Sequence, residues 1–184
     1  SGSELEITSA GVLTFASAPD YETKSSYTAT VTASDGTNST TQAITVNVTD
    51  VNEAPAFTSN ATFSAAENQT AIGTVAASDA DSDTITYSVS GSEITINSSS
   101  GVIAFASAPD YETKSSYTAT VTASDGTNSS TQDITVNVTN VNDNSPSFTS
   151  SATFSADENQ TAIGTVAASD ADSDTITYSV SGTD

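Results

Sequence analysis

Apolar and polar residues alternate along several segments of the chain. In residues 26–34, Tyr27, Ala29, Val31 and Ala33 would lie on one face of a strand, with threonines between them on the other face. The segments AITVNVT and TITYSVS alternate in the same way. Strict alternation of this kind predicts β-strands that have one buried side and one solvent-facing side.

The segments SDADSD, NSSSG and SDGTN separate the alternating stretches. Their Gly, Asn, Asp and Ser residues are typical of turns. We count about seven strands in each stretch of about 90 residues and no convincing helix. The pattern therefore predicts an all-β chain built from two-sheet sandwiches.

Long parts of the sequence recur. DYETKSSYTATVTASDGTNS occupies residues 20–39 and again 110–129, and ENQTAIGTVAASDADSDTITYSVSG occupies residues 67–91 and again 158–182. A repeat of about 90 residues is a small domain rather than one turn of a solenoid. The expected fold class is thus a tandem array of Greek-key β-sandwich repeats, with seven strands in each repeat.

The connections DVNEAP and NVNDNSP set the expected boundaries. We predict a complete repeat with its linker at residues 55–145, the C-terminal half of a repeat with its linker at 1–54, and the N-terminal half of a repeat at 146–184. Half a sandwich cannot cover its core face or its edge strands. Two interpretations stay open: a portion of a longer array, or completion of one chain by the next, head to tail.

The charge of the chain is strongly one-sided. It has 23 acidic residues, two lysines and no arginine or histidine, for a net charge of −21. This balance excludes nucleic acid and anionic membrane surfaces as partners, and no stretch is long and apolar enough for insertion into a membrane. A salt-adapted surface or simple solubility would explain scattered acids. The clustering in SDADSD, which occurs twice, favours cation binding instead.

Cysteine and histidine are both absent. This excludes disulfides and argues against zinc and copper, so hard cations are favoured. Together with the composition rich in Ser, Thr, Ala and Val, it suggests an extracellular or cell-surface protein from a bacterium, whose exported proteins do without disulfides.

Several short acidic motifs follow one another in a fixed order. They are AEN with Glu67, DYE with Asp110 and Glu112, SDG with Asp125, NVNDNSP with Asn140, Asn142, Asp143 and Asn144, and DAD with Asp170 and Asp172. In these motifs the whole chain resembles the cadherin-like, calcium-binding tandem repeats of large bacterial surface or secreted adhesins. The resemblance implies several Ca²⁺ ions at the junctions between repeats. Carboxylate and amide oxygens are the ligands that Ca²⁺ prefers.

The resemblance also implies which residues would bind metal at each junction. The first junction would use Asp20, Glu22, Asp50, Asn52 and Glu53, with Asp79, Asp81 and Asp125 from the following repeat. The second would use Glu67, Asp110, Glu112, Asn140, Asn142, Asp143 and Asn144, with Asp170 and Asp172 beyond. In a head-to-tail arrangement, Glu158 and Asp35 of adjacent molecules would complete the sites. Asn140 and Glu53 both stand where the family has Asp.

We therefore expect a calcium-rigidified repeat array that forms the stalk or fibre of an extracellular adhesin. One alternative is a self-assembling filament subunit whose half-repeats complete each other. A carbohydrate-binding module is a weaker alternative, because the chain has no Trp for an aromatic platform. We expect no enzyme, since no nucleophile–base pair is evident. The expected partners are neighbouring repeats or other copies of the chain, with a glycan or cell-surface ligand bound elsewhere in the parent protein.

Overall fold

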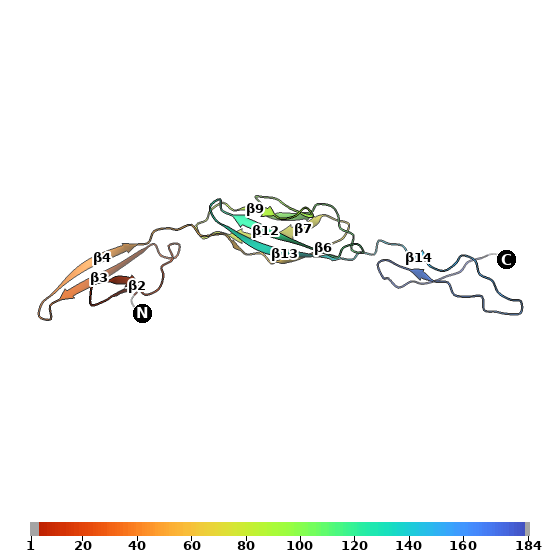
Figure 1. Cartoon of the computed structure of the whole chain (residues 1–184), viewed down its shortest axis with the longest axis horizontal. Coiled ribbons are helices and arrows are strands. Elements are labelled where there is room, and N and C mark those ends of the chain that lie inside the picture. Colours follow the sequence, from red (N-terminus) through yellow and green to blue (C-terminus); the bar gives the residue numbers. More distant parts are fainter. Residues whose placement is uncertain (1–3, 183–184) are drawn as a thin grey trace.

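The computed structural model describes residues 4–182, and every regular element in them is a β-strand. Three parts follow one another along an elongated molecule (Figure 1). We call residues 4–48 the N-terminal segment, 56–139 the central domain and 147–182 the C-terminal segment. Extended connections join them. No helix in this part of the chain is long and apolar enough to cross a membrane.

The central domain is a sandwich of two sheets. One sheet has the strand order β6-β13-β12-β9 and the other the order β10-β11-β7. The bounds are β6 Thr62–Ala66, β7 Ala71–Thr74, β9 Thr86–Val89, β10 Ile94–Ile96, β11 Val102–Phe105, β12 Ser116–Ser124 and β13 Ser129–Thr139. A short pair, β5 (Ala56–Phe57) with β8 (Ala77–Ser78), is added to these seven strands. Only β6 and β13 pair in parallel.

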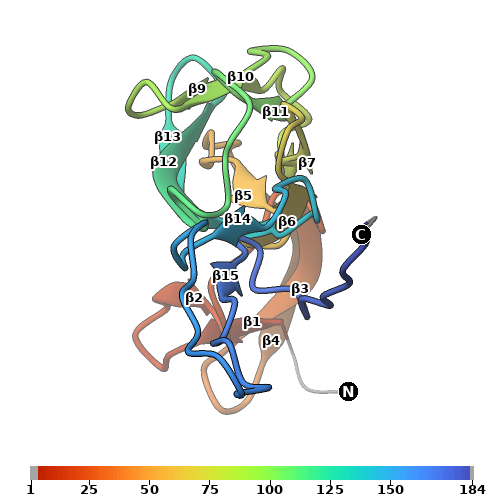
Figure 2. The ribbon, with the colours of Figure 1, turned by 90° about the vertical axis from the view of Figure 1, so that its right-hand side faces the viewer.

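The apolar positions of the alternating pattern fill the space between the two sheets. Val121 of β12 and Ile134 and Val136 of β13 are almost completely buried, as are Ile103 of β11 and Val75. A view along the molecule shows β12 and β13 in one layer and β7 and β11 in the other (Figure 2). The predicted strands, with one buried face and one polar face, thus build the core of a sandwich.

The two flanking segments are not closed sandwiches. The N-terminal segment contains two hairpins, β1 (Leu5–Ile7) with β2 (Leu13–Phe15) and β3 (Ser26–Ser34) with β4 (Ser39–Asn47). In the C-terminal segment only β14 (Ser147–Phe148) and β15 (Ala168–Ser169) form a pair. Apolar side chains in both segments are therefore exposed. Leu13 is 38% exposed where its equivalent Ile103 is fully buried, and Val166 is 44% exposed where Val75 is 1% exposed.

One sequence has two structures in this chain. Residues 158–182 are identical to residues 67–91, yet only the first copy forms β7 and β9. In the central domain β7 pairs with β11, and β9 pairs with β12. The described part of the C-terminal segment has no equivalent of these two partner strands. The pairing partner, rather than local sequence, decides whether these residues become strands.

The repeat offers a matched test of the sandwich packing. Gly101 has φ +69°, and a Cβ added to it would collide with the carbonyl oxygen of Val75; its equivalent Gly11 has φ +82° and open space around the added Cβ. Both Gly→Ala changes cost about 1–2 kcal/mol, because alanine is strained in the left-handed region. Gly91, inside the central domain, also has φ +82° and open space around an added Cβ. The collision should make Gly101→Ala about 1–3 kcal/mol more destabilising to the central domain than Gly91→Ala, measured by urea unfolding, while Gly11→Ala leaves that domain unchanged. Equal losses would contradict this packing.

Candidate metal centre

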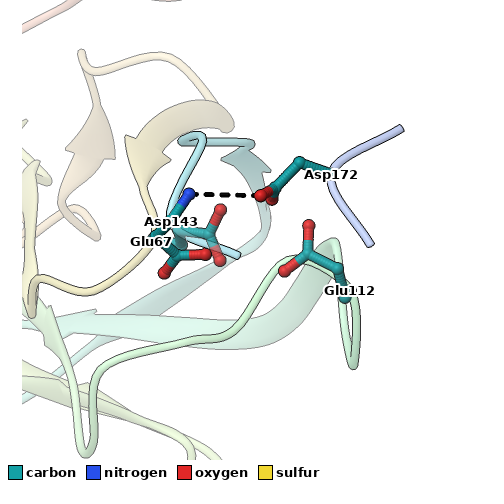
Figure 3. A group of neighbouring side chains, drawn as sticks. All are labelled: Glu67, Glu112, Asp143 and Asp172. Carbon is teal, nitrogen blue, oxygen red and sulfur yellow. Dashed lines mark hydrogen bonds between the residues drawn. The ribbon is translucent and has the colours of Figure 1, made fainter. Parts of the chain in front are cut away.

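Four carboxylates meet where the central domain joins the C-terminal segment (Figure 3). Glu67 directly follows β6, Glu112 lies in the loop before β12, Asp143 lies in the connection, and Asp172 lies in the second SDADSD loop. One carboxylate oxygen of each lies within 4.8 Å of the others. Figure 3 shows the four groups around a common space, with a hydrogen bond from Asp143 to Asp172. We call this group the second-junction cluster.

The fold holds Glu67 in place through backbone donors. Its side chain is buried, and its two oxygens accept hydrogen bonds from the N–H groups of Val141 and Tyr111, each at 2.7 Å. The parallel pairing of β6 with β13 places Ala66 opposite Thr139, so the chain leaving β13 passes next to Glu67. Glu67 thereby joins the end of the sandwich to the start of the linker.

The other members of the cluster differ in their electrostatic surroundings. Oδ2 of Asp172 accepts hydrogen bonds from the N–H groups of Asn144 (2.8 Å) and Asp143 (3.2 Å), and the Asn144 N–H lowers the pKa of Asp172. Loss of water around Glu112, together with the negative charges of Glu67 and Asp172, raises the pKa of Glu112. The cluster therefore carries crowded negative charge that its hydrogen bonds do not fully offset.

A smaller cluster lies where the N-terminal segment joins the central domain. Carboxylate oxygens of Glu22, Glu53 and Asp81 lie within 4.8 Å of one another, and the N–H of Glu53 donates to Asp81 at 3.0 Å. Partial burial and the negative charges of Asp81 and Asp50 raise the pKa of Glu53. An open recess of about 430 Å³ borders Glu22 and Glu53. We call this group the first-junction cluster.

Each SDADSD loop also gathers its own three aspartates. Asp79, Asp81 and Asp83 approach within 4.8 Å, and so do their counterparts in the second copy. Oδ2 of Asp79 and Oδ1 of Asp81 are buried and have no hydrogen-bond partner. Buried carboxylate oxygens normally have a donor or a metal ion. These two atoms therefore fit a bound cation.

The two lysines do not neutralise any of these clusters. Lys24 pairs with Glu4 and Lys114 with Glu93, and both ammonium groups lie over a tyrosine ring. The chain has no other cationic side chain. A balancing charge at the junctions would come from outside the chain. Several carboxylate and carbonyl oxygens without nitrogen or sulfur ligands suit Ca²⁺.

Three more of the residues predicted for the second junction lie against its cluster. The side-chain amide of Asn140 donates to the carbonyl oxygen of Asp172 at 3.2 Å, and the amide of Asn144 donates to Asp143 at 2.7 Å. Asp170 accepts a hydrogen bond from the N–H of Asp172 at 3.0 Å. At the other end of the central domain, the amide of Asn52 donates to Asp125 at 2.8 Å.

Other predicted residues either bond within their own loop or form no hydrogen bond. Asp110 and Asp20 cap their own loops by accepting hydrogen bonds from the N–H and the hydroxyl group of a threonine three residues later. Asp35 caps the turn between β3 and β4. Asp50, Asn142 and Glu158 form no hydrogen bond in the described part of the chain.

The predicted ligand set did not include four residues that the structure places at the junctions. Asp83 and Asp174 are the third aspartates of the SDADSD loops. Asn68 donates to Asp143, and Asn128 donates to the carbonyl oxygen of Asn52. The repeated SDADSD string signalled the two aspartates. No local pattern signalled the two asparagines, because their partners lie 75 and 76 residues away.

Residues 61–139 match the family described as Cadherin domain. The chain contains a cadherin-like domain. It is 36% identical over 187 residues to the protocadherin-like wing polarity protein stan of Drosophila melanogaster, with 88% of this chain and 5% of that protein covered. It is 35% identical over 151 residues to cadherin EGF LAG seven-pass G-type receptor 1 of Mus musculus, with 75% and 5% covered. The chain thus spans about one twentieth of the length of these curated relatives.

Among solved structures, the cis-dimer structure of protocadherin gammaB7 EC3-6 superposes with a TM-score of 0.64 at 28% identity, covering 93% of this chain and 49% of that chain. The predicted all-β, cadherin-like sandwich fold is confirmed. These comparisons indicate no enzymatic family. The named relatives are animal proteins, so the comparisons do not support the bacterial source that the sequence suggested.

The role of Glu67 in the cadherin-like domain can be tested without metal. Glu67→Ala removes the acceptor of two backbone N–H groups, and buried unsatisfied donors cost about 1–3 kcal/mol each. Because relief of like-charge repulsion offsets part of this, we expect a loss of about 1–3 kcal/mol in chelator, measured by urea unfolding. Glu158→Ala is the matched control, since the same ENQTAIG sequence surrounds an exposed Glu158 without these contacts. Equal losses for both variants would contradict the assignment.

Proposed function

We propose that this chain is part of an extracellular adhesion protein in which Ca²⁺ bound between successive repeats stiffens the array into a stalk. The observation that supports this proposal most directly is the second-junction cluster. Its members come from the cadherin-like domain (Glu67 and Glu112), from the linker (Asp143) and from the next segment (Asp172). An ion bound by all four would tie three parts of the chain together.

The mechanism is mechanical. Without a cation, like charges on the domain and on the next segment repel each other, so the next segment is free to change its orientation relative to the domain. A divalent ion attracts all four carboxylates at once. The two parts are then held in one orientation, and the same principle applies at the first-junction cluster of Glu22, Glu53 and Asp81.

Further oxygens would complete the coordination that Ca²⁺ needs, six to eight ligands in all. At the second junction the proposed additional ligands are Asp170, Asn140, Asn142 and Asn144, and at the first Asp79, Asp50, Asn52 and Asp125. Asp110 and Asp20 would become ligands if their carboxylates gave up the hydrogen bonds from their threonines and bound the ion instead. The match of residues 61–139 to the Cadherin domain family fits this proposal.

The stalk proposal predicts a thermal response to calcium. A ligand that binds only the folded state stabilises it by about 2.7 kcal/mol at a hundredfold excess over Kd. For a domain of this size, this raises the melting temperature by about 10–20 °C. Glu112→Gln combined with Asp172→Asn should remove the second junction's share of this rise in melting temperature, because both changes keep the shape of the side chain but remove ligand charge. Asp133→Asn, on β13 and outside both clusters, is the control and should keep the full rise.

Solution scattering supplies the mechanical readout for the same variants. Calcium should narrow the distribution of molecular lengths less in the double variant than in the wild type and in Asp133→Asn, because only the first junction can still be stiffened. A full thermal rise in the double variant, or no calcium response in the wild type, would refute the proposal.

One observation favours a second candidate function, self-assembly into filaments. The N-terminal segment carries the equivalents of β10, β11, β12 and β13. The C-terminal segment carries the sequences that form β7 and β9 in the central domain, and the equivalent of β6 with Asp157 in place of Ala66. The central domain is therefore a template for joining the C-terminal segment of one copy to the N-terminal segment of the next. Adjoining sequence in a longer chain would cover the same faces within one molecule.

The exposed apolar residues are those that this completion would bury. Val180 is 98% exposed, whereas its equivalent Val89 packs against the core of the central domain. Leu13 is 38% exposed, and its equivalent Ile103 is fully buried. Head-to-tail joining repeats itself at every free end, so it produces open chains rather than closed dimers.

Light scattering of two end-blocked variants tests this directionality. Val180→Asp should block the C-terminal face and Leu13→Asp the N-terminal face, because each places a charge in the joined core. We expect assemblies for the wild-type polypeptide, a monomer of 18.5 kDa for each variant alone, and a 1:1 dimer when the two variants are mixed. A wild-type polypeptide that stays monomeric in calcium would contradict self-assembly.

A further inference from the structure

Asparagine amides reach the linkers from both ends of the central domain. Nδ2 of Asn68 donates to Oδ2 of Asp143 at 2.5 Å, and Nδ2 of Asn128 donates to the carbonyl oxygen of Asn52 at 2.7 Å. Asp143 and Asn52 belong to the two linkers, whereas both donors belong to the sandwich. We call these two contacts the amide clasps.

The backbone of Asn68 is held in place by contacts that do not involve its side chain. Asn68 has φ 64°, in the left-handed region that Asn tolerates better than most residues. Its N–H donates to the carbonyl oxygen of Pro109 at 3.0 Å, and its neighbour Glu67 is held by two backbone donors. The amide of Asn68 therefore extends from a fixed base to the linker.

The clasp at the first junction is a closed ring of hydrogen bonds. The N–H of Asn128 donates to Oδ1 of Asp125 at 2.6 Å, and its side-chain amide donates to the carbonyl oxygen of Asn52. The side-chain amide of Asn52 returns to Oδ2 of Asp125 at 2.8 Å. The linker is thus held to the turn between β12 and β13 by two side-chain bonds.

Amides suit this position because they donate to a carboxylate without occupying all of its lone-pair sites. A carboxylate has about four lone-pair sites. Asn68 uses one site on Oδ2 of Asp143, and the amide of Asn144 uses one on Oδ1. A site on each oxygen stays free for a cation. Both lysines of the chain are engaged elsewhere, so neutral amides are the donors that hold the acidic linkers.

We propose that Asn68 and Asn128 are positioning residues that hold the linkers against the sandwich before calcium arrives. The linker oxygens are then already placed when the ion binds, which lowers the ordering cost of binding. This inference rests on the proposed calcium function. It adds two residues that act through Asp143 and Asn52 rather than as ligands.

The repeat supplies a matched control for each clasp. Asn159 lies in the same ENQTAIG sequence as Asn68 with φ 66°, and Asn38 lies in the same SDGTN sequence as Asn128. Within the described residues, neither side-chain amide bonds a linker. Asn68→Gly with Asn159→Gly, and Asn128→Ala with Asn38→Ala, therefore compare one substitution with and without the clasp. Glycine at the first pair keeps the left-handed backbone.

Two readouts test the inference. In calcium titration calorimetry, we expect Asn68→Gly and Asn128→Ala each to weaken binding at their own junction about tenfold, the loss of one preorganising hydrogen bond to the linker. In chelator, hydrogen exchange followed by NMR should be several-fold faster for the Asp143 and Asn144 N–H groups in Asn68→Gly. The two control variants should match the wild type in both readouts.

The outcomes separate the two proposals. A wild type that binds no calcium refutes the proposed function, while the exchange rates in chelator still test the Asn68 clasp. Calcium binding and exchange rates in Asn68→Gly equal to those in Asn159→Gly would overturn the clasp. A variant whose central domain loses stability in chelator, with linker exchange unchanged, would also overturn it, because the residue would then support the sandwich only.

Discussion

Repulsion between neighbouring carboxylates is the constraint on which the junctions of this molecule depend. Glu67, Glu112, Asp143 and Asp172 offer oxygens within 4.8 Å of one another, and the pKa of Glu112 is raised by lost water and by two of these charges. The only cationic side chains pair with other acids. Backbone N–H groups and neutral amides relieve part of the repulsion, and a divalent cation from outside would relieve the rest. Under the proposed function, the orientation of successive repeats would depend on divalent cations in the medium.

The strand pairing of the sandwich creates that crowding. The parallel pairing of β6 with β13 sets Ala66 opposite Thr139, so Glu67 and the first linker residues emerge side by side. The N–H of Val141 then meets Glu67 at 2.7 Å. A fold that ended these two strands apart would scatter the same acids over the surface. Because a rigid sheet fixes the ends of both strands, the junction is a consequence of the fold's topology.

Much of the candidate site follows from sequence, but not how each member is used. The motifs AEN, DYE, NVNDNSP and DAD contain all four carboxylates of the second-junction cluster. The same motifs place Asp110 beside Glu112, yet the structure turns Asp110 onto Thr113. Asn68 is the last residue of AEN, but no local pattern shows that its amide reaches Asp143, 75 residues away. A short polar side chain has local and distant partners of similar strength, and only the folded geometry chooses between them.

The sequence by itself determined the alternation that makes strands, the length of the repeat, and the acids and amides present at each junction. Only the tertiary structure decided which copy of a repeated sequence is ordered into a sheet. Residues 67–91 and 158–182 are identical, and β7 and β9 form only in the first copy, where β11 and β12 lie beside them. A strand satisfies its backbone N–H and C=O groups across to a neighbour, so no property of the strand's own residues can supply the partner.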